Sequence, residues 1–156
     1  MGEEDKMYDL MNKDFSELTV WELHAILKAR CDVFVVEQNC VCADIDGLDP
    51  TSRHIFIMTE DGRCAACLRI FRKPDEPTAA RIGRVVTTER GKDLGRKILH
   101  EAVLEGARME GIEELYIEAQ TYAVGFYEKE GFRVCSGEFM EDGFPHVAMR
   151  LAIYNS

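Results

Sequence analysis

The chain has 156 residues, of which 46% are hydrophobic and 31% charged, and its formal net charge is −10 at pH 7. These values predict one soluble domain over residues 1–156, and the acidic balance argues against nucleic acid as a partner. The chain has no run of about 20 apolar residues that predicts a membrane span and no signal-peptide pattern, so we expect a cytoplasmic protein with reduced thiols.

The first predicted elements are a strand over residues 7–11 and a helix that ends near residue 32. Thr19 and Glu22 have the spacing of a capping box, which predicts the start of that helix. Residues 33–36 are an apolar run that fits either a strand or a buried helix end. The expected apolar stripe of the helix is Val20, Leu23, Leu27 and Cys31.

A polar loop over residues 38–52 follows and contains Asp44, Asp46 and Asp49. These aspartates do not form an EF-hand, because a glycine comes one residue after the second aspartate and no glutamate closes the loop. We expect them to cap a turn or to bind a cationic molecule.

The next segment predicts a hairpin and then a third strand. Residues 54–60 and 63–72 read as two strands joined at Asp61-Gly62, which is a hairpin turn signal. A loop over residues 73–77 leads to a strand over residues 80–87. Cys64 and Cys67 are three residues apart on a strand, so we expect them on opposite faces, which disfavours a zinc site.

A basic, glycine-containing turn over residues 90–97 leads into a helix that ends near residue 110. Between Arg84 and Lys97 the net charge is +3, whereas the remaining 142 residues carry −13. Free N–H groups and the positive end of a helix dipole favour an anion at such a turn. The turn is therefore predicted to bind phosphate, and the acidic remainder is predicted to attract cationic molecules.

The last elements are a strand over residues 115–120, a helix over 123–130, a strand over 133–139, a turn over 141–145 and a strand over 146–151. This order predicts an α/β domain with a mixed central sheet of six to seven strands flanked by about four helices. The segment 80–120 predicts a parallel strand pair joined by a right-handed crossover.

Two motifs resemble the GNAT family of acyl-CoA N-acyltransferases. The first is Arg90-x-x-Asp93-x-Gly95, where the family pattern is Gln/Arg-x-x-Gly-x-Gly/Ala and Asp93 replaces the middle glycine. The second begins at Gln120, which replaces the usual asparagine, and continues through Ala123 and Tyr127 to Gly131-Phe132. Within the family, residues 30–39, 44–49, 82–86 and 141–146 resemble the ElaA-like branch.

The resemblance implies an acetyl-CoA-dependent N-acetyltransferase with a single GNAT-like domain and no metal. It implies that Tyr127 is a general acid toward the departing thiolate, with His146 and Glu118 as candidate bases. The expected acceptor is a primary amine on a small, cationic molecule. The implied coenzyme-binding residues are Val85, Val86, Thr87, Arg90, Gly91, Lys92, Asp93, Leu94, Gly95, Arg96, Gln120, Phe126 and Tyr127. The implied acceptor-binding residues are Arg30, Phe34, Glu37, Asp46 and His146.

Arg30 borders the apolar stripe of the first helix, so it needs a carboxylate partner when buried. Glu37 is the nearest candidate in the sequence. Two roles stay open for Arg30, namely a buried ion pair that shapes the acceptor side and a direct contact with the substrate.

Three other functions remain as alternatives. One is a non-catalytic module that senses acyl-CoA. Another is an acyl-homoserine lactone synthase, because residues 30–37 of this chain loosely resemble the start of that related fold. The third is an unrelated nucleotide binder with ATP as its ligand. The expected assembly is a monomer or a homodimer.

Overall fold

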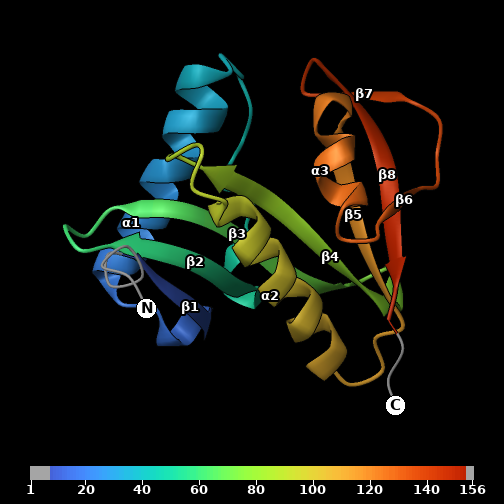
Figure 1. The fold of residues 1–156 in the computed structure, drawn as a ribbon, viewed down its shortest axis with the longest axis horizontal. Coiled ribbons are helices and arrows are strands. Elements are labelled where there is room, and N and C mark those ends of the chain that lie inside the picture. The colour runs from blue at the N-terminus through green and yellow to red at the C-terminus, as the bar shows by residue number, and fades with distance from the viewer. Residues whose placement is uncertain (1–7, 154–156) are drawn as a thin grey trace. The chain divides into compact units, whose positions relative to one another are not determined.

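The computed structural model describes residues 8–153, which form two compact units (Figure 1). Within the described residues, the first unit contains the chain up to Arg69 together with Arg84–Ile98. The second unit contains Ile70–Gly83 and the chain from Leu99 onward. The start of the predicted first strand, at residue 7, lies outside the described residues. The prediction of one domain over residues 1–156 stays a prediction.

The first unit orders its strands β1-β2-β3-β4. β1 pairs with β2 in the antiparallel sense, with Tyr8 opposite Thr59 and Asp14 opposite Arg53. Its elements are β1 (Tyr8–Asp14), α1 (Val20–Arg30), β2 (Arg53–Thr59), and the parts of β3 (Cys64–Lys73), β4 (Glu76–Thr87) and α2 (Leu94–Arg108) that belong to it.

The second unit orders its strands β4-β5-β8-β6, and β7 also pairs with β8. β4 and β5 are parallel, whereas β5 and β8 are antiparallel, so the predicted α/β fold with a mixed sheet is confirmed. The further elements of this unit are β5 (Glu114–Gln120), α3 (Val124–Glu128), β6 (Arg133–Val134), β7 (Phe139–Glu141) and β8 (Phe144–Ala152).

The described residues contain eight strands and three α-helices, compared with the predicted six to seven strands and about four helices. One cause is the predicted strand over residues 133–139, which is divided into the short strands β6 and β7. No helix among the described residues has the length and apolar character needed to cross a bilayer.

The predicted capping box starts α1. The backbone N–H of Glu22 donates to Thr19 Oγ1 over 3.0 Å, and the Thr19 N–H donates to Glu22 Oε1 over 2.9 Å. These bonds satisfy N–H groups that have no partner within the helix. After α1 the chain continues in wider helical turns over Cys31–Glu37, so residues 33–36 form a helical segment and not a strand.

The buried face of α1 differs from the predicted apolar stripe. Val20 is 77% exposed and Cys31 is exposed, whereas Glu22 and Arg30 are buried. The predicted stripe contained only apolar residues, whereas charged residues that have partners also lie on the buried face. Glu22 is paired with Lys13 over 3.0 Å, and pairing removes most of the cost of burying a charge. The buried residues of α1 are Glu22, Ala25, Ile26, Ala29 and Arg30.

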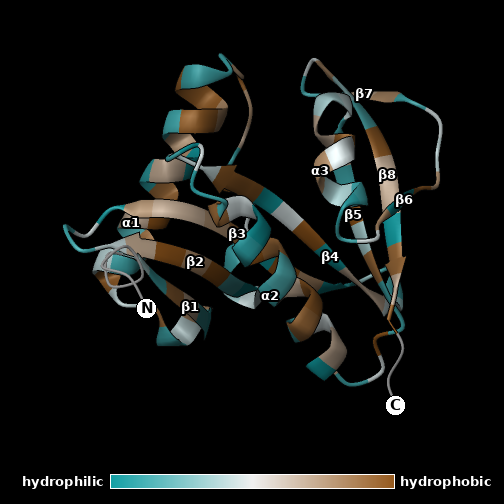
Figure 2. Ribbon diagram, viewed as in Figure 1, coloured by the Kyte–Doolittle hydropathy of each residue, from teal (hydrophilic) through white to brown (hydrophobic). Residues whose placement is uncertain are grey.

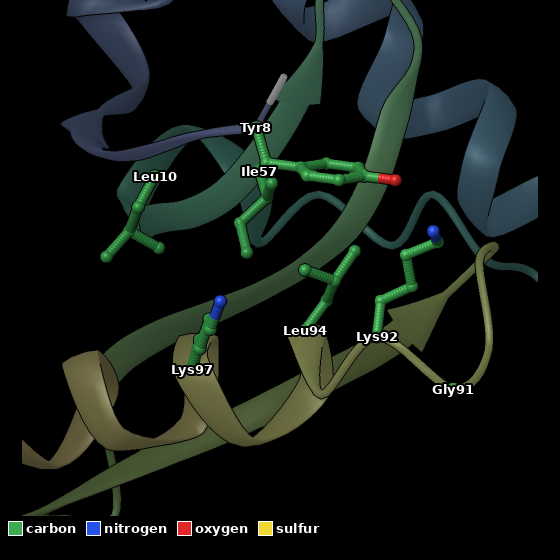
Figure 3. A pocket seen from close by; sticks show the side chains of 7 residues that line it. All are labelled: Tyr8, Leu10, Ile57, Gly91, Lys92, Leu94 and Lys97. Atoms are coloured by element: carbon green, nitrogen blue, oxygen red, sulfur yellow. The ribbon is translucent and has the colours of Figure 1, made fainter. Parts of the chain in front are cut away.

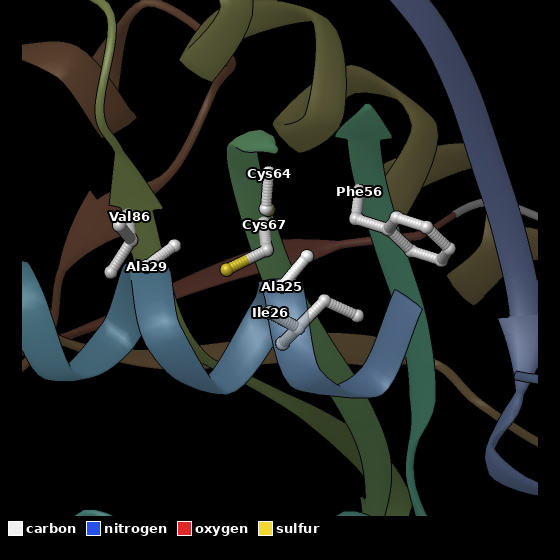
Figure 4. Close-up of a cluster of buried hydrophobic side chains, with 7 residues drawn as sticks. All are labelled: Ala25, Ile26, Ala29, Phe56, Cys64, Cys67 and Val86. Atoms are coloured by element: carbon white, nitrogen blue, oxygen red, sulfur yellow. The ribbon is translucent and has the colours of Figure 1, made fainter. Parts of the chain in front are cut away.

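The core of the first unit lies between α1 and strands that are largely hydrophobic (Figure 2). The small alanines of α1 leave room for larger side chains from the strands. The cluster comprises Ala25, Ile26, Ala29, Phe56, Cys64, Cys67 and Val86 (Figure 4).

The expectation that Cys64 and Cys67 face opposite sides was wrong, because both belong to this cluster. Cys64 Sγ also donates to the carbonyl of Ala66 over 3.2 Å. A hydrogen bond with Cys64, together with burial, raises the pKa of Cys67 well above its ordinary value. The Cys67 thiol is therefore a protonated core group at neutral pH.

β5 separates a buried face from an open face in the second unit. Leu115, Ile117 and Ala119 are buried, whereas the alternate residues Tyr116 and Glu118 are only half-buried. α2 covers the buried face closely at Gly106, where a Cβ atom would lie 2.6 Å from Leu115 Cδ2. The alternation therefore directs Tyr116 and Glu118 to the face opposite α2.

Candidate functional site

The basic turn between β4 and α2 uses the left-handed backbone conformation twice. Gly91 has φ +77° and Asp93 has φ +63°. Aspartate tolerates this conformation better than most residues, so Asp93 supplies the backbone shape that the family pattern obtains from glycine. The carbonyl of Asp93 accepts from the N–H of Lys97 over 3.3 Å, which places the free N–H groups of the first helical turn directly after Asp93.

The charge of Asp93 is neutralised locally. Its carboxylate accepts a hydrogen bond from Arg96 Nε over 2.7 Å, and both side chains are more than half exposed. This pair reduces the repulsion that Asp93 exerts on a phosphate at the turn. Phosphate binding therefore remains compatible with the aspartate.

The two lysines of the turn line a cavity of about 310 Å³ within the first unit (Figure 3). Lys97 extends toward the β1 and β2 side chains, and Lys92 extends alongside Tyr8. The lining residues are Tyr8, Leu10, Ile57, Gly91, Lys92, Leu94 and Lys97. The cavity thus combines an apolar floor with two ammonium groups.

Arg90 pairs with Glu37 instead of extending freely from the turn. Its Nη2 lies 2.8 Å from Glu37 Oε1, and the two side chains are 80% and 55% exposed. Exposed ion pairs contribute only about 0–1 kcal/mol to stability, so a phosphate can compete with Glu37 for the Arg90 guanidinium. The pair joins the helical segment Cys31–Glu37 to the turn.

Arg30 is 1% exposed, and its partners are Asp44 and Asp49 instead of the predicted Glu37. Arg30 Nη1 lies 2.7 Å from Asp49 Oδ1, and Nε lies 3.0 Å from Asp44 Oδ2. Sequence proximity was a poor guide here, because the polar loop folds back onto α1. The buried ion pair is therefore the role that the structure supports for Arg30.

Asp46 is held by Arg69 and Arg84 in the same cluster. Arg69 Nη2 lies 2.5 Å from Asp46 Oδ2, Arg84 Nη2 lies 3.3 Å from the same atom, and Asp46 Oδ1 accepts from the N–H of Leu48. These contacts support the turn-capping alternative for Asp46. Hydrogen bonding to Arg69 holds the pKa of Asp46 far below its ordinary range.

Arg69 was missed in the sequence, although an arginine within the apolar run 64–71 signals a nearby carboxylate. Arg69 also lies 3.1 Å from Asp49, and Arg84 Nε lies 2.9 Å from Asp44 Oδ1. Burial alone raises the pKa of Asp49, but hydrogen bonding and charge from Arg30 and Arg69 lower it overall. We call Arg30, Arg69, Arg84, Asp44, Asp46 and Asp49 the arginine–aspartate cluster.

β4 contains an irregular backbone position before the residues predicted to bind the pantetheine arm. Its register with β5 covers Ala79–Arg81, and Arg84 then adopts φ +52°, which interrupts the regular strand. The side chain of Val86 is 2% exposed and belongs to the core, so only its backbone is available to a ligand. Phe34 packs against the same core cluster.

Tyr127 lies on α3 in an aromatic environment and is 7% exposed. Its ring meets Phe126 edge-on at a centroid distance of 5.0 Å and Phe132 at 6.1 Å. Burial raises the pKa of Tyr127 well above that of a free phenol. The phenol therefore stays protonated at neutral pH, which favours hydrogen-bond donation over full proton transfer.

Glu118 and His146 lie in the second unit with Gln120. Tyr116 donates to Glu118 Oε2 over 3.0 Å, and Arg81 Nη2 lies 3.2 Å from Oε1. His146 is directly opposite Gln120 across the β5–β8 pair. The Nδ1–H of His146 donates to the Phe144 carbonyl over 2.8 Å, so the neutral ring has its lone pair on Nε2.

The predicted site residues therefore fall into two groups. Residues 85–87 and the turn over 90–96 belong to the first unit, with Arg30, Phe34, Glu37 and Asp46. Glu118, Gln120, Phe126, Tyr127 and His146 belong to the second unit.

Residues 29–153 match the model of the acetyltransferase (GNAT) domain. The chain belongs to the GNAT acetyltransferase family. The match covers both motifs that carry the resemblance, which is thereby confirmed.

GNAT relatives extend over nearly the whole chain. Protein ElaA of Escherichia coli is 36% identical over 147 residues, which cover 92% of this chain and 95% of that protein. A UPF0039 protein of Schizosaccharomyces pombe is 36% identical, with 93% and 97% coverage. The likeness to the ElaA-like branch is thereby confirmed.

Solved GNAT structures share the fold. The crystal structure of Escherichia coli ElaA has a TM-score of 0.84 at 36% identity and covers 92% of this chain and 99% of that chain. An acyl-CoA N-acyltransferase from Pseudomonas aeruginosa has a TM-score of 0.83 at 33% identity, with 91% and 98% coverage.

Proposed function

We propose that the protein is an acetyl-CoA-dependent N-acetyltransferase that acts on the primary amine of a small acceptor. The observation that carries the proposal is the turn at Gly91 and Asp93, whose left-handed residues precede the N-terminus of α2 in a GNAT chain. Basic side chains surround this turn in a protein with a net charge of −10. An anionic donor such as acetyl-CoA suits that combination.

Coenzyme A fits the residues of the first unit. The N–H groups at the start of α2, with Arg90 and Lys92, are suited to hold its pyrophosphate. The backbone of residues 85–87 is suited to bond the pantetheine arm, and a strand N–H there polarises the acetyl carbonyl. Acetyl-CoA supplies an activated thioester, so the reaction needs positioning and proton transfer but no metal.

The residues of the second unit supply the proton chemistry. An acceptor arrives as an ammonium ion and must lose a proton before it attacks. Glu118 and His146 Nε2 are the groups suited to take that proton. Tyr127 is suited to donate a hydrogen bond to the departing sulfur, because its phenol remains protonated.

We expect coenzyme A and acetyl-CoA to raise the melting temperature, whereas ATP leaves it unchanged. A ligand that binds only the folded state stabilises that state by about 2.7 kcal/mol when its free concentration is 100 times its Kd. The measurement is a thermal-shift series at equal ligand concentrations. Stabilisation by ATP alone would overturn the coenzyme assignment. In parallel, release of coenzyme A from acetyl-CoA is measured with a panel of amines. If acetyl-CoA binds but no amine causes coenzyme A release, the protein is a sensor and not an enzyme.

Replacing Glu37 by glutamine is expected to tighten coenzyme A binding by about two- to fivefold, because Arg90 no longer has to leave a carboxylate partner. Isothermal titration calorimetry gives this change directly. The matched control is Asp32→Asn, which removes one charge from the same segment at a site paired with Lys28. Weaker binding by Glu37→Gln would contradict competition between Glu37 and the coenzyme.

A further inference from the structure

A two-residue turn determines which side chains lie beside His146. Asp142 and Gly143 alone join β7 to β8. Both are left-handed, with φ +52° and φ +83°, as in a type I′ hairpin turn. Such a turn fixes the register of the strands that it joins, and a slip of one residue would send each side chain of β7 to the other face. The stretch 141–146, which resembles the ElaA-like branch, therefore sets the surroundings of the imidazole.

This register places an aromatic ring beside the imidazole. Phe139 is directly opposite His146 in the β7–β8 pair, and opposite residues project from the same face. The two rings are stacked, with centroids 5.9 Å apart and planes 22° apart. The stack sets the plane of the imidazole, and the bond from Nδ1–H to the Phe144 carbonyl over 2.8 Å selects one of its two flipped orientations. Two contacts from different strands therefore fix the position of Nε2.

The Nε2 atom of His146 belongs to the open face of the second unit. Across the β5–β8 pair, His146 is opposite Gln120 and Ala148 is opposite Glu118, so the three polar side chains share that face. Among residues 8–153, no side chain or backbone group bonds Nε2. Its lone pair is thus available to an incoming N–H group.

The other candidate base is already engaged on both of its oxygen atoms. Glu118 Oε1 lies 3.2 Å from Arg81 Nη2, and Oε2 accepts from the Tyr116 hydroxyl over 3.0 Å. To take a proton, Glu118 would have to give up one of these contacts. His146 needs to give up none, and imidazole is the side chain best suited to accept a proton near neutral pH.

We propose that Phe139 is a positioning residue for His146, whose Nε2 takes the proton from the ammonium group of the acceptor. This inference rests on the proposed function and chooses between its two candidate bases. Glu118 then orders the open face through Arg81 and Tyr116 and does not exchange the proton. The sequence marked His146 as a candidate but gave no sign of its aromatic neighbour.

The proton and bond balance is complete. An N–H bond of the ammonium breaks, and its proton passes to Nε2 of His146. The freed lone pair forms the C–N bond at the acetyl carbon, while the C–S bond breaks and leaves its electron pair on sulfur. The nitrogen then loses a second proton, which ends on the sulfur of coenzyme A. The imidazolium returns its proton to water, so one proton is released per turnover.

The first test follows the ring of His146 by ¹⁵N NMR in the protein without ligands. We expect the wild type to show a neutral ring fixed as Nδ1–H, and Phe139→Leu to show a mixture of the two tautomers because the ring turns more freely. Phe139→Tyr keeps an aromatic ring and should restore the single tautomer. Met140→Leu is the matched control, since Met140 is the next residue, is 66% exposed and points to the other face.

The second test compares kinetics with acetyl-CoA and either n-butylamine or spermidine as the acceptor. We expect Phe139→Leu to lower kcat by about tenfold with little change in KM for acetyl-CoA, because the base is displaced. Phe139→Tyr should recover most of the loss, and Met140→Leu should match the wild type. A melting curve checks the fold of each variant, which should persist because Phe139 lies on a three-residue strand and is only half-buried.

The third test identifies the base from the pH profile of kcat. We expect the decline toward acid between about pH 5 and 8 to disappear in His146→Gln, which should also lower kcat by about 100-fold. The decline should persist in Glu118→Gln and in Glu141→Gln. The other titratable or charged groups on this face are Arg81, Tyr116, Glu118, Glu141 and Arg150.

The outcomes separate this inference from the proposed function. An unchanged His146 tautomer and kcat in Phe139→Leu would overturn the role of Phe139, as would an equal loss of kcat in Phe139→Tyr. Loss of the acid decline in Glu118→Gln, with its retention in His146→Gln, would overturn the choice of base while leaving the enzyme intact. A single tautomer that depends on Phe139, without release of coenzyme A by any amine, would refute the proposed function alone.

Discussion

Replacing Arg30 by methionine is expected to lower the free energy of unfolding by about 3 kcal/mol. Removal of one partner from a buried ion pair typically costs about 3–5 kcal/mol, because the remaining charge stays buried without compensation. The lower end applies here because each aspartate retains a second arginine partner. Asp49 still lies 3.1 Å from Arg69, and Asp44 still lies 2.9 Å from Arg84. Methionine nearly preserves the volume, so the loss reports on charge more than on a cavity.

Urea unfolding measures this loss, provided that the slope with denaturant is unchanged between variants. The control is Arg63→Met, because Arg63 is 62% exposed and pairs with Asp61 over 2.9 Å. That variant should lose much less stability than Arg30→Met, because an exposed ion pair contributes little. Similar losses in the two variants would show that the arginine–aspartate cluster does not stabilise the fold through its buried charges.

Replacing Tyr127 by phenylalanine is expected to lower kcat by about 100-fold. A positioned acid or base contributes roughly 10²–10⁴-fold, and the raised pKa of Tyr127 favours the lower end because the phenol donates a hydrogen bond without readily giving up its proton. KM for acetyl-CoA should change little. The aromatic contacts with Phe126 and Phe132 do not need the hydroxyl, so the fold should persist.

Steady-state kinetics with acetyl-CoA and the most active amine give this comparison, and a melting curve checks the fold of each variant. Tyr122→Phe is the control, because Tyr122 lies five residues away and is 78% exposed. An unchanged kcat in Tyr127→Phe would mean that another group or water donates the hydrogen bond to the departing sulfur.

Local patterns predicted most of the secondary structure. The capping box at Thr19 and Glu22, the turn at Asp61-Gly62 and the parallel pair of β4 and β5 all lie where the sequence places them. Each of these features depends on residues that are close together in the sequence or on a regular alternation of apolar side chains. That information is present before the chain folds.

The partners of buried charges could not be predicted in the same way. Arg30 contacts aspartates 14 and 19 residues further along the chain, and Arg69 reaches back 23 residues to Asp46. A one-dimensional pattern contains no measure of such distances.

In the turn before α2, an aspartate adopts the backbone conformation that the family pattern obtains from a glycine. Asp93 reaches a left-handed conformation that glycine reaches more easily, and the amide groups of the turn depend on that shape alone. The codons for glycine and aspartate can differ by a single base. Evolution can therefore change the charge beside the amide groups in one mutational step, without rebuilding the loop that presents them.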